Sequence, residues 1–119
     1  MLMWHRKLYL IDHGAALYFH HNWETMPGKA ESPFPEIGQH VLLPWASRIA
    51  EAAKVAHSRL DRDVFTGILQ QVQDAWLETE PAGESAAQKR AGYIEFFVRR
   101  LAASKPFEQE AIRAYGRLV

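Results

Sequence analysis

The chain has 119 residues, of which 14 are Lys or Arg and 14 are Asp or Glu, so its formal net charge at pH 7 is +0. This length suits one domain or one lobe of a larger one, and a composition of 48% hydrophobic and 24% charged residues excludes general disorder. The balanced charge argues against nucleic-acid binding, which needs a basic excess, and no apolar run reaches the roughly 18 residues of a membrane span.

The sequence contains no cysteine. Disulfides, thiolate metal sites and cysteine nucleophiles are therefore excluded for these residues. The first seven residues, MLMWHRK, are unlike a signal peptide, because the basic residues follow the apolar ones and no cleavage site comes after an apolar core. We therefore expect a cytoplasmic protein.

Two short strands are predicted near the N-terminus. Residues 8–11 and 15–19 are apolar runs rich in strand-forming residues, and the Asp-His-Gly sequence between them is a predicted turn. Residues 5–7 are a predicted earlier turn, which makes residues 1–4 the end of a preceding strand. The predicted hairpin therefore needs other elements to cover it, because two strands alone are marginally stable.

A proline-rich connection follows the predicted hairpin. Residues 24–36 hold three of the six prolines in the chain. Proline fixes its own φ and disfavours helix in the residue before it, so we expect irregular structure over residues 24–43. Connections of this length in compact domains are often functional or mobile.

The remaining residues, 44–119, are predicted to be helical. Apolar residues recur at helical spacing in four segments, namely Ala46, Ile49, Ala50 and Ala53; Phe65, Ile68, Leu69 and Val72; Ile94, Phe97, Val98 and Leu101; and Phe107, Ala111, Ala114 and Leu118. Asp61 and Ser104 are candidate N-caps, while Pro44 and Pro106 suit first helical turns.

The expected fold is α+β and mostly α, with a short N-terminal β-hairpin packed on three to four helices. Residues 1–119 form a single predicted domain. Within it, residues 1–23 are the hairpin, residues 24–43 the connection and residues 44–119 the helical part.

One segment of the predicted hairpin suggests chemistry. Asp12 ends an apolar strand, and Gly14 follows two positions later. Phosphoryl-transfer enzymes hold a carboxylate at a strand end in this way, where it binds the Mg²⁺ that bridges nucleotide phosphates. The same short pattern is also that of an ordinary turn, so by itself it leaves both interpretations open.

A longer stretch is more specific. The sequence LIDHGAALYFHH at residues 10–21 closely resembles the segment after the catalytic loop in HipA-type kinases, which share a distant fold with protein kinases and phosphatidylinositol 3- and 4-kinases. HVLLP at 40–44, QDAWL at 73–77 and YIEFF at 93–97 resemble later landmarks of the family in the same order. The resemblance covers nearly the whole chain.

This resemblance implies a role for each residue of the motif. Asp12 matches the metal-binding Asp of an Asp-Phe-Gly-like motif, with His13 in its middle position and Gly14 as its glycine. Residues 2–4 match the strand after the catalytic loop. The family's catalytic Asp and second metal-binding Asn would precede residue 1, and its nucleotide-gripping Lys and N-terminal lobe would lie further upstream.

The resemblance therefore implies the C-terminal lobe of a kinase, a truncated domain whose full-length form uses Mg²⁺ and ATP to phosphorylate a hydroxyl group. Because phosphoryl transfer needs several groups acting together, we expect this chain alone to be inactive and to bind the cofactors weakly or not at all. The expected partners are an N-terminal lobe or a second copy of the chain.

A histidine-based metal protein is an alternative. Asp12, His13, His20 and His21 lie close in sequence, with His5 not far before them, and imidazole suits Zn²⁺. In a strand, however, adjacent histidines point to opposite faces, and the spacing matches no zinc pattern.

A non-enzymatic protein-interaction module is the other alternative, because a lobe without its partner exposes apolar surface. His20, His21 and Trp23 are candidates to line a cleft beside the motif. For Trp23, packing in a core is the competing interpretation, since large aromatic side chains are ordinarily buried.

Overall fold

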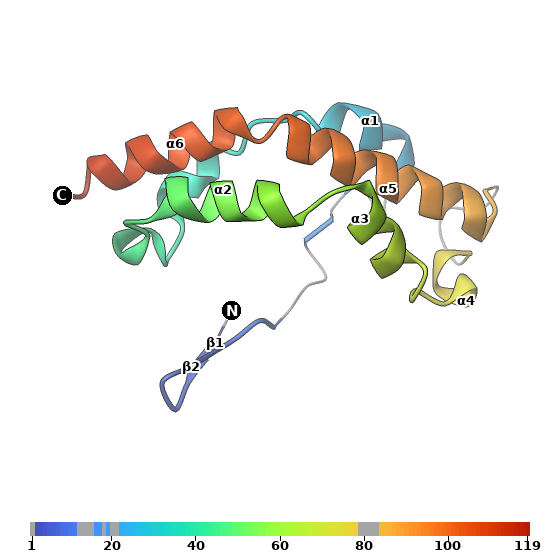
Figure 1. The fold of residues 1–119 in the computed structure, drawn as a ribbon, viewed down its shortest axis with the longest axis horizontal. Coiled ribbons are helices and arrows are strands. Elements are labelled where there is room, and N and C mark those ends of the chain that lie inside the picture. The colour runs from blue at the N-terminus through green and yellow to red at the C-terminus, as the bar shows by residue number, and fades with distance from the viewer. Residues whose placement is uncertain (1, 12–15, 18, 20–21, 79–83) are drawn as a thin grey trace.

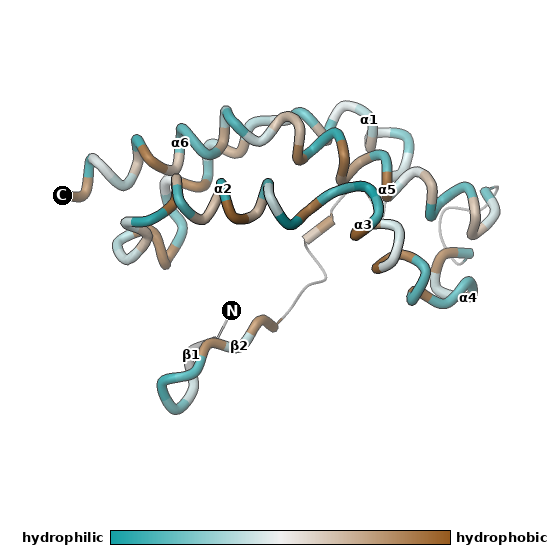
Figure 2. Tube along the Cα trace, in the orientation of Figure 1, coloured by the Kyte–Doolittle hydropathy of each residue, from teal (hydrophilic) through white to brown (hydrophobic). Residues whose placement is uncertain are grey.

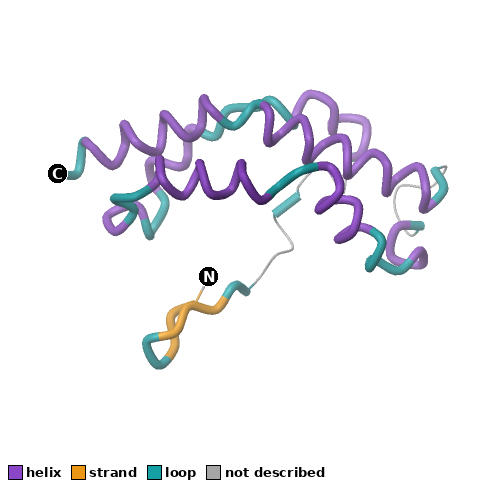
Figure 3. The backbone as a smooth tube through the Cα atoms, in the orientation of Figure 1, coloured by secondary structure: helices purple, strands orange, loops and turns teal. Residues whose placement is uncertain are grey.

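The structure is a computed structural model that describes residues 2–11, 16, 17, 19, 22–78 and 84–119, with only the backbone of Leu2 and Met3. It contains the strands β1 (Leu2–Trp4) and β2 (Lys7–Tyr9), the helices α1 (Met26–Lys29), α2 (Ile49–Arg59), α3 (Arg62–Leu69), α4 (Asp74–Leu77), α5 (Ala86–Ala102) and α6 (Lys105–Gly116), and the short 3₁₀ helices η2 (Trp23–Thr25), η3 (Pro35–Gln39) and η4 (Leu43–Trp45). The described part is mainly helical with one two-stranded sheet, as Figure 3 shows, which confirms the expected mostly α class. No helix among these is long and apolar enough to cross a membrane.

The longer helices form two rows (Figure 1). α5 and α6 follow one another along one side of the molecule, and α2 and α3 lie beside them, with α2 against α6 and α3 against α5. The segment that carries α1 and η3 lies behind the first row, where η3 contacts α6. Each row is interrupted once, at residues 60–61 and at residues 103–104.

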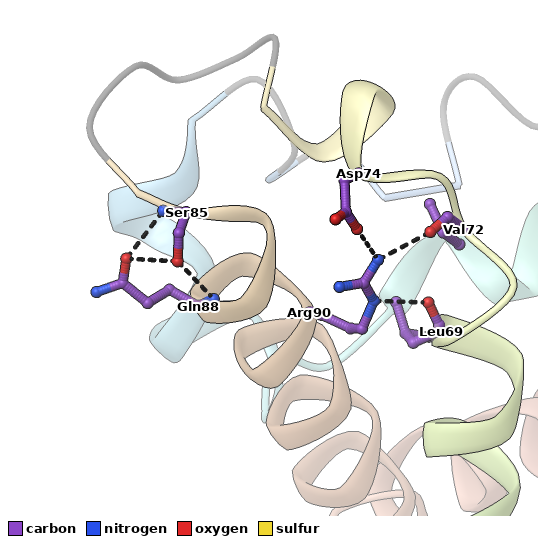
Figure 4. Close-up of polar contacts among 6 residues, drawn as sticks. All are labelled: Leu69, Val72, Asp74, Ser85, Gln88 and Arg90. Atoms are coloured by element: carbon purple, nitrogen blue, oxygen red, sulfur yellow. Dashed lines mark hydrogen bonds and ion pairs between the residues drawn. The ribbon is translucent and has the colours of Figure 1, made fainter.

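Local side-chain contacts explain where these helices begin. Asp61 caps α3 by accepting a hydrogen bond from the Val64 backbone at 2.9 Å, as the sequence predicted. Ser85 and Gln88 form a reciprocal capping box at the start of α5, which Figure 4 shows. Ser104 stands at the N-cap position of α6, but its side chain makes no capping hydrogen bond.

Arg90 of α5 fixes the connection between α3 and α4 (Figure 4). Its Nε donates to the Leu69 carbonyl at 2.9 Å, and its Nη2 donates to the Val72 carbonyl at 2.8 Å and to Asp74 Oδ1 at 2.6 Å. The Leu69 carbonyl also accepts from the Val72 backbone, so this arginine adds charged hydrogen bonds at the point where the regular hydrogen bonding of α3 ends.

An aromatic cluster forms the main core. Phe19 and Trp23 pack on α5, with ring-centroid distances of 4.3 Å from Phe19 to Phe96 and 4.9 Å from Trp23 to Tyr93. Gly92 makes the second contact possible, since a Cβ there would lie 2.7 Å from Trp23 Cζ2. In Figure 2 the helices carry alternating polar and apolar stretches, as expected for helices with one buried face.

The hairpin differs from the predicted one. β1 pairs with β2 in antiparallel register, which confirms the preceding strand over residues 2–4 and the earlier turn at residues 5 and 6, whereas Lys7 already belongs to β2. His5 and Arg6 form that turn with φ of 46° and 61°, the left-handed conformation that a two-residue hairpin turn requires. The predicted strand at residues 15–19 is wrong where it is described, because Ala16 and Leu17 lie in a turn.

The hairpin also does not pack on the helices as expected. It projects from the helical rows in Figure 1, and the described side chains of Trp4, Lys7, Leu8 and Tyr9 are all exposed. The physical reason is that Phe19 and Trp23 already fill the main apolar core on α5, so that core does not need the hairpin to cover it.

The proline-rich connection is more ordered than predicted. It contains α1 and η3, and Pro27 and Pro35 stand at the first positions of these turns. Proline is compatible with a first turn because its fixed φ is helical and its missing N–H has no partner there. Pro44 likewise lies in the first turn of η4, which Leu43 starts, and α2 begins at Ile49, later than its apolar stripe suggested.

We expect Gly92→Ala to destabilise the protein by about 1–3 kcal/mol, because its added methyl overlaps the rigid Trp23 indole. Gly67→Ala is the matched control in α3, where nothing lies within 4 Å of the new Cβ, and it should stabilise by about 1 kcal/mol through helix propensity. Urea denaturation measures both changes. Equal effects of the two substitutions would contradict the packing of Trp23 on α5.

Candidate functional site

The motif residues Asp12, His13, Gly14, His20 and His21 lie outside the described residues, so their predicted metal and cleft roles stay predictions. The chain on either side of them is described. Before the motif, Leu10 and Ile11 are exposed after the end of β2.

After the motif, Phe19 is buried in the aromatic core. Trp23 is described too, and it is 8% exposed between Phe19 and Tyr93. This position fits the packing interpretation of the residue. The C-terminal side of the motif is therefore anchored to α5 by two large aromatic rings, whereas its N-terminal side continues into the projecting hairpin.

A second candidate site is a hollow of about 620 Å³ between the two rows of helices, here called the α2–α6 hollow. Its walls include Ile49, Ala53 and Ala56 of α2, Phe97 and Leu101 of α5, and Phe107 of α6. Small alanine side chains on α2 face larger ones across the gap, so the two rows do not fill the space between them. The volume lies in the range of small-molecule sites.

A polar cluster lines one side of the hollow. His57 Nε2 of α2 lies 2.8 Å from Ser104 Oγ and 3.0 Å from Glu108 Oε1 of α6. Ser104 is buried, with 4% of its surface exposed. The cluster joins α2 to α6 at the point where the α5–α6 row is interrupted, and sequence reasoning missed it because His57 and Glu108 are 51 positions apart.

The cluster is not a nucleophilic triad. In a Ser-His-acid triad the acid holds Nδ1 of the histidine, which leaves Nε2 to take the proton of the serine. Here the serine and the carboxylate both face Nε2. A proton on Nε2 directed at Glu108 cannot activate Ser104, so the geometry is that of a structural link between two helices.

Glu108 is the electrostatic centre of this link. The hydrogen bond from Ser104 is the main cause that holds the pKa of Glu108 below its ordinary value of 4.5, and His57 adds to it while burial opposes it. The carboxylate is therefore ionised in the folded protein at neutral pH. Nearby, burial lowers the pKa of Arg100, which lies over the Phe107 ring at 4.3 Å.

Lys89 is an unusual charged residue of the core. It is 1% exposed on the face of α5 that also carries Tyr93 and Phe96, and its Nζ makes no hydrogen bond within the structure as described. Burial of an ammonium group in an apolar core without a partner destabilises the fold, because the group loses its hydration and gains no hydrogen bond or ion pair. Its sequence context, a basic pair with acidic residues nearby, favours a solvated helix face, and the burial of Lys89 shows that this interpretation is wrong.

Metal-ligating groups do not cluster elsewhere in the part of the chain that is described. Within it, no set of three or more His, Asp or Glu side chains is arranged to hold a metal ion. Comparisons with protein-family models, curated proteins and solved structures give no match to this chain. The chemistry of the residues themselves therefore carries the functional argument.

The lowered pKa of Glu108 has a consequence for stability. In the unfolded state Glu108 has its ordinary pKa of 4.5, so it takes up a proton at a higher pH than in the folded state. The stabilisation that the ionised carboxylate gives the fold is therefore complete above the unfolded-state pKa and is lost as the pH falls through the lower folded-state pKa. We expect Glu108→Gln to be less stable than wild type at neutral pH, with the gap closing in acid. Thermal unfolding from neutral pH into acid checks this. A gap that stays constant with pH would contradict it.

Replacement of Lys89 by an apolar side chain of similar length should stabilise the protein. We expect Lys89→Met to raise the free energy of unfolding by about 1 kcal/mol or more, because it removes a buried amine that has no hydrogen-bond partner among the described residues and keeps the packing. Lys54→Met on exposed α2 is the matched control and should change it by less than about 0.5 kcal/mol. A destabilised Lys89→Met protein would show that this ammonium has a favourable partner.

Proposed function

We propose that this chain supplies the metal-binding loop of a HipA-like kinase, in which Asp12 binds the Mg²⁺ that bridges the phosphates of ATP. The observation that carries the proposal is the sequence LIDHGAALYFHH at residues 10–21, which follows directly on a β-hairpin. A carboxylate at the end of a strand, followed by a glycine, is the arrangement that phosphoryl-transfer sites use to hold the ion.

The position of the hairpin supports this proposal. The resemblance assigns residues 2–4 to the strand after the catalytic loop, and β1 covers Leu2–Trp4. β2 then ends at Tyr9, three positions before Asp12. The order strand, tight turn, strand and acidic motif is thus what the resemblance implies for this part of a kinase.

The helices have a supporting role in this proposal. Phe19 and Trp23, which follow the motif, are packed on Tyr93 and Phe96 of α5. A metal ligand contributes most when its backbone is fixed before the ion arrives, because less conformational entropy is lost on binding. The aromatic core thereby holds one end of the proposed metal loop.

The proposed contribution of this chain is limited to binding. Phosphoryl transfer depends on positioning and charge stabilisation by several groups, and the resemblance places the catalytic Asp, a second metal-binding Asn and the nucleotide lobe before Leu2. Asp12 alone is therefore expected to hold a divalent ion weakly without transferring a phosphoryl group. The acceptor in the full kinase is a hydroxyl group.

Paramagnetic Mn²⁺, which takes the oxygen ligands of Mg²⁺, tests the proposal on this chain. In amide NMR spectra, we expect Mn²⁺ to broaden the signals of Leu10 and Ile11 selectively, because they adjoin the proposed ligand. Asp12→Asn should abolish this broadening. The control Asp63→Asn, an exposed acid in the first turn of α3, should leave it intact.

Broadening that persists in Asp12→Asn, or that appears first at other acids such as Glu51, would refute the metal role of Asp12. An excess of Mg²⁺ should compete with Mn²⁺ and restore the Leu10 and Ile11 signals, whereas competition by Zn²⁺ alone would favour the histidine-based metal site instead.

A protein-interaction module is a second candidate function, and the surface of the molecule favours it. Trp4, Leu8, Val41, Trp45 and Trp76 are each at least 49% exposed. Scattered exposed apolar residues such as Val41, Trp45 and Trp76 are normal in proteins, but Trp4 and Leu8 lie together on the projecting hairpin, where exposed apolar groups mark an interaction site.

A further inference from the structure

The molecule has much more surface than a compact protein of its size. Its accessible surface is 8956 Å², whereas a folded monomer of 13.6 kDa has about 6,600 Å². Its radius of gyration is 16.1 Å, against about 13.5 Å for a compact domain of this length. The excess of about 2,400 Å² is surface that folding of one chain leaves uncovered.

Part of this excess lies on the N-terminal arm, here defined as residues 2–11. Trp4, Leu8, Tyr9 and Ile11 are each 43% or more exposed. Trp4 pairs with Lys7 and Leu8 with Met3, so the apolar side chains lie on both faces of the hairpin. A two-stranded hairpin with apolar residues exposed to solvent on both faces is only marginally stable by itself, and it gains stability when another surface covers it.

The α2–α6 hollow is the complementary surface. It is open, apolar and lined by the small side chains of Ala53 and Ala56, so it accepts large apolar groups without a rearrangement of the helices. Each chain therefore carries one projecting apolar arm and one unfilled apolar hollow. In Figure 1 the arm extends away from the helical rows.

We propose that a second copy of the chain covers these surfaces, with the arm of each copy seated in the α2–α6 hollow of the other. Exchange of the same element in both directions gives a closed two-fold dimer. The area supports a second copy as the occupant. The excess surface of about 2,400 Å² per chain is larger than the roughly 800 Å² per partner that a standard interface buries, so the chain has enough uncovered surface for a second copy. The proposal rests on the interaction function and does not depend on metal binding by Asp12.

Multi-angle light scattering on the full chain tests the dimer directly. We expect twice the chain mass across the micromolar range. Leu8→Glu on the arm and Ala53→Glu in the hollow should each weaken dimerisation by about 100-fold or more, because each would bury an unpaired charge. The control Ala50→Glu changes an exposed residue of α2 that does not line the hollow, and it should leave the mass unchanged.

A mixing experiment identifies the arm-to-hollow contact. Leu8→Glu chains keep an intact hollow and Ala53→Glu chains keep an intact arm, so an equimolar mixture restores one of the two contacts. We expect dimers in the mixture at concentrations where each variant alone is monomeric. Circular dichroism of each variant establishes that it is folded, and recovery on mixing excludes misfolding as the cause of the loss.

Several results would overturn the proposal. The first is a monomer at all micromolar concentrations, whether its arm is exposed or folds back into the hollow of the same chain. The second is a dimer that neither substitution weakens, and the third is a pair of variants that stay monomeric on mixing. A small apolar molecule found in the hollow of a monomer by native mass spectrometry would also overturn it, because the site would then hold a ligand in place of the arm. None of these results alters the Mn²⁺ test of Asp12.

Discussion

The packing of Phe19 and Trp23 on α5 is the contact on which the rest of the structure depends. These two rings lie 4.3 Å from Phe96 and 4.9 Å from Tyr93, and they are the buried link between the N-terminal segment and the helices in the described chain. Their position requires a glycine at 92, because any side chain there would occupy the volume of the indole. The aromatic core thus determines where the segment with the proposed metal motif emerges from the helical rows.

Away from this core the molecule is incompletely packed. Alanines of α2 line the hollow beside α6, and the link from His57 to Ser104 and Glu108 holds the two helices together without filling that space. The arm and the α2–α6 hollow therefore share one property, because both present apolar groups that a single chain leaves unburied. Association is the general means by which small folds cover such surface, and it is independent of the chemistry proposed for Asp12.

The two proposals concern different parts of the chain and have different supports. The metal role rests on the order of residues around Asp12 and on the hairpin that precedes it. The dimer rests on the surface area and on the shapes of the arm and the hollow. They meet at Leu10 and Ile11, where the arm leads into the proposed metal loop, so occupation of the hollow by the arm would also restrain the N-terminal side of that loop.

The sequence by itself determined the local features of this protein. Helical spacing located α3, α5 and α6, Asp61 predicted a cap, and the turn at residues 5 and 6 followed from the residues beside it. Such features depend on neighbours within a few positions, which the sequence displays. Tertiary structure alone decided that the hairpin projects, that Trp23 is buried on Gly92, and that His57 meets Glu108. These depend on which apolar face covers which, a competition among distant segments that no local pattern records.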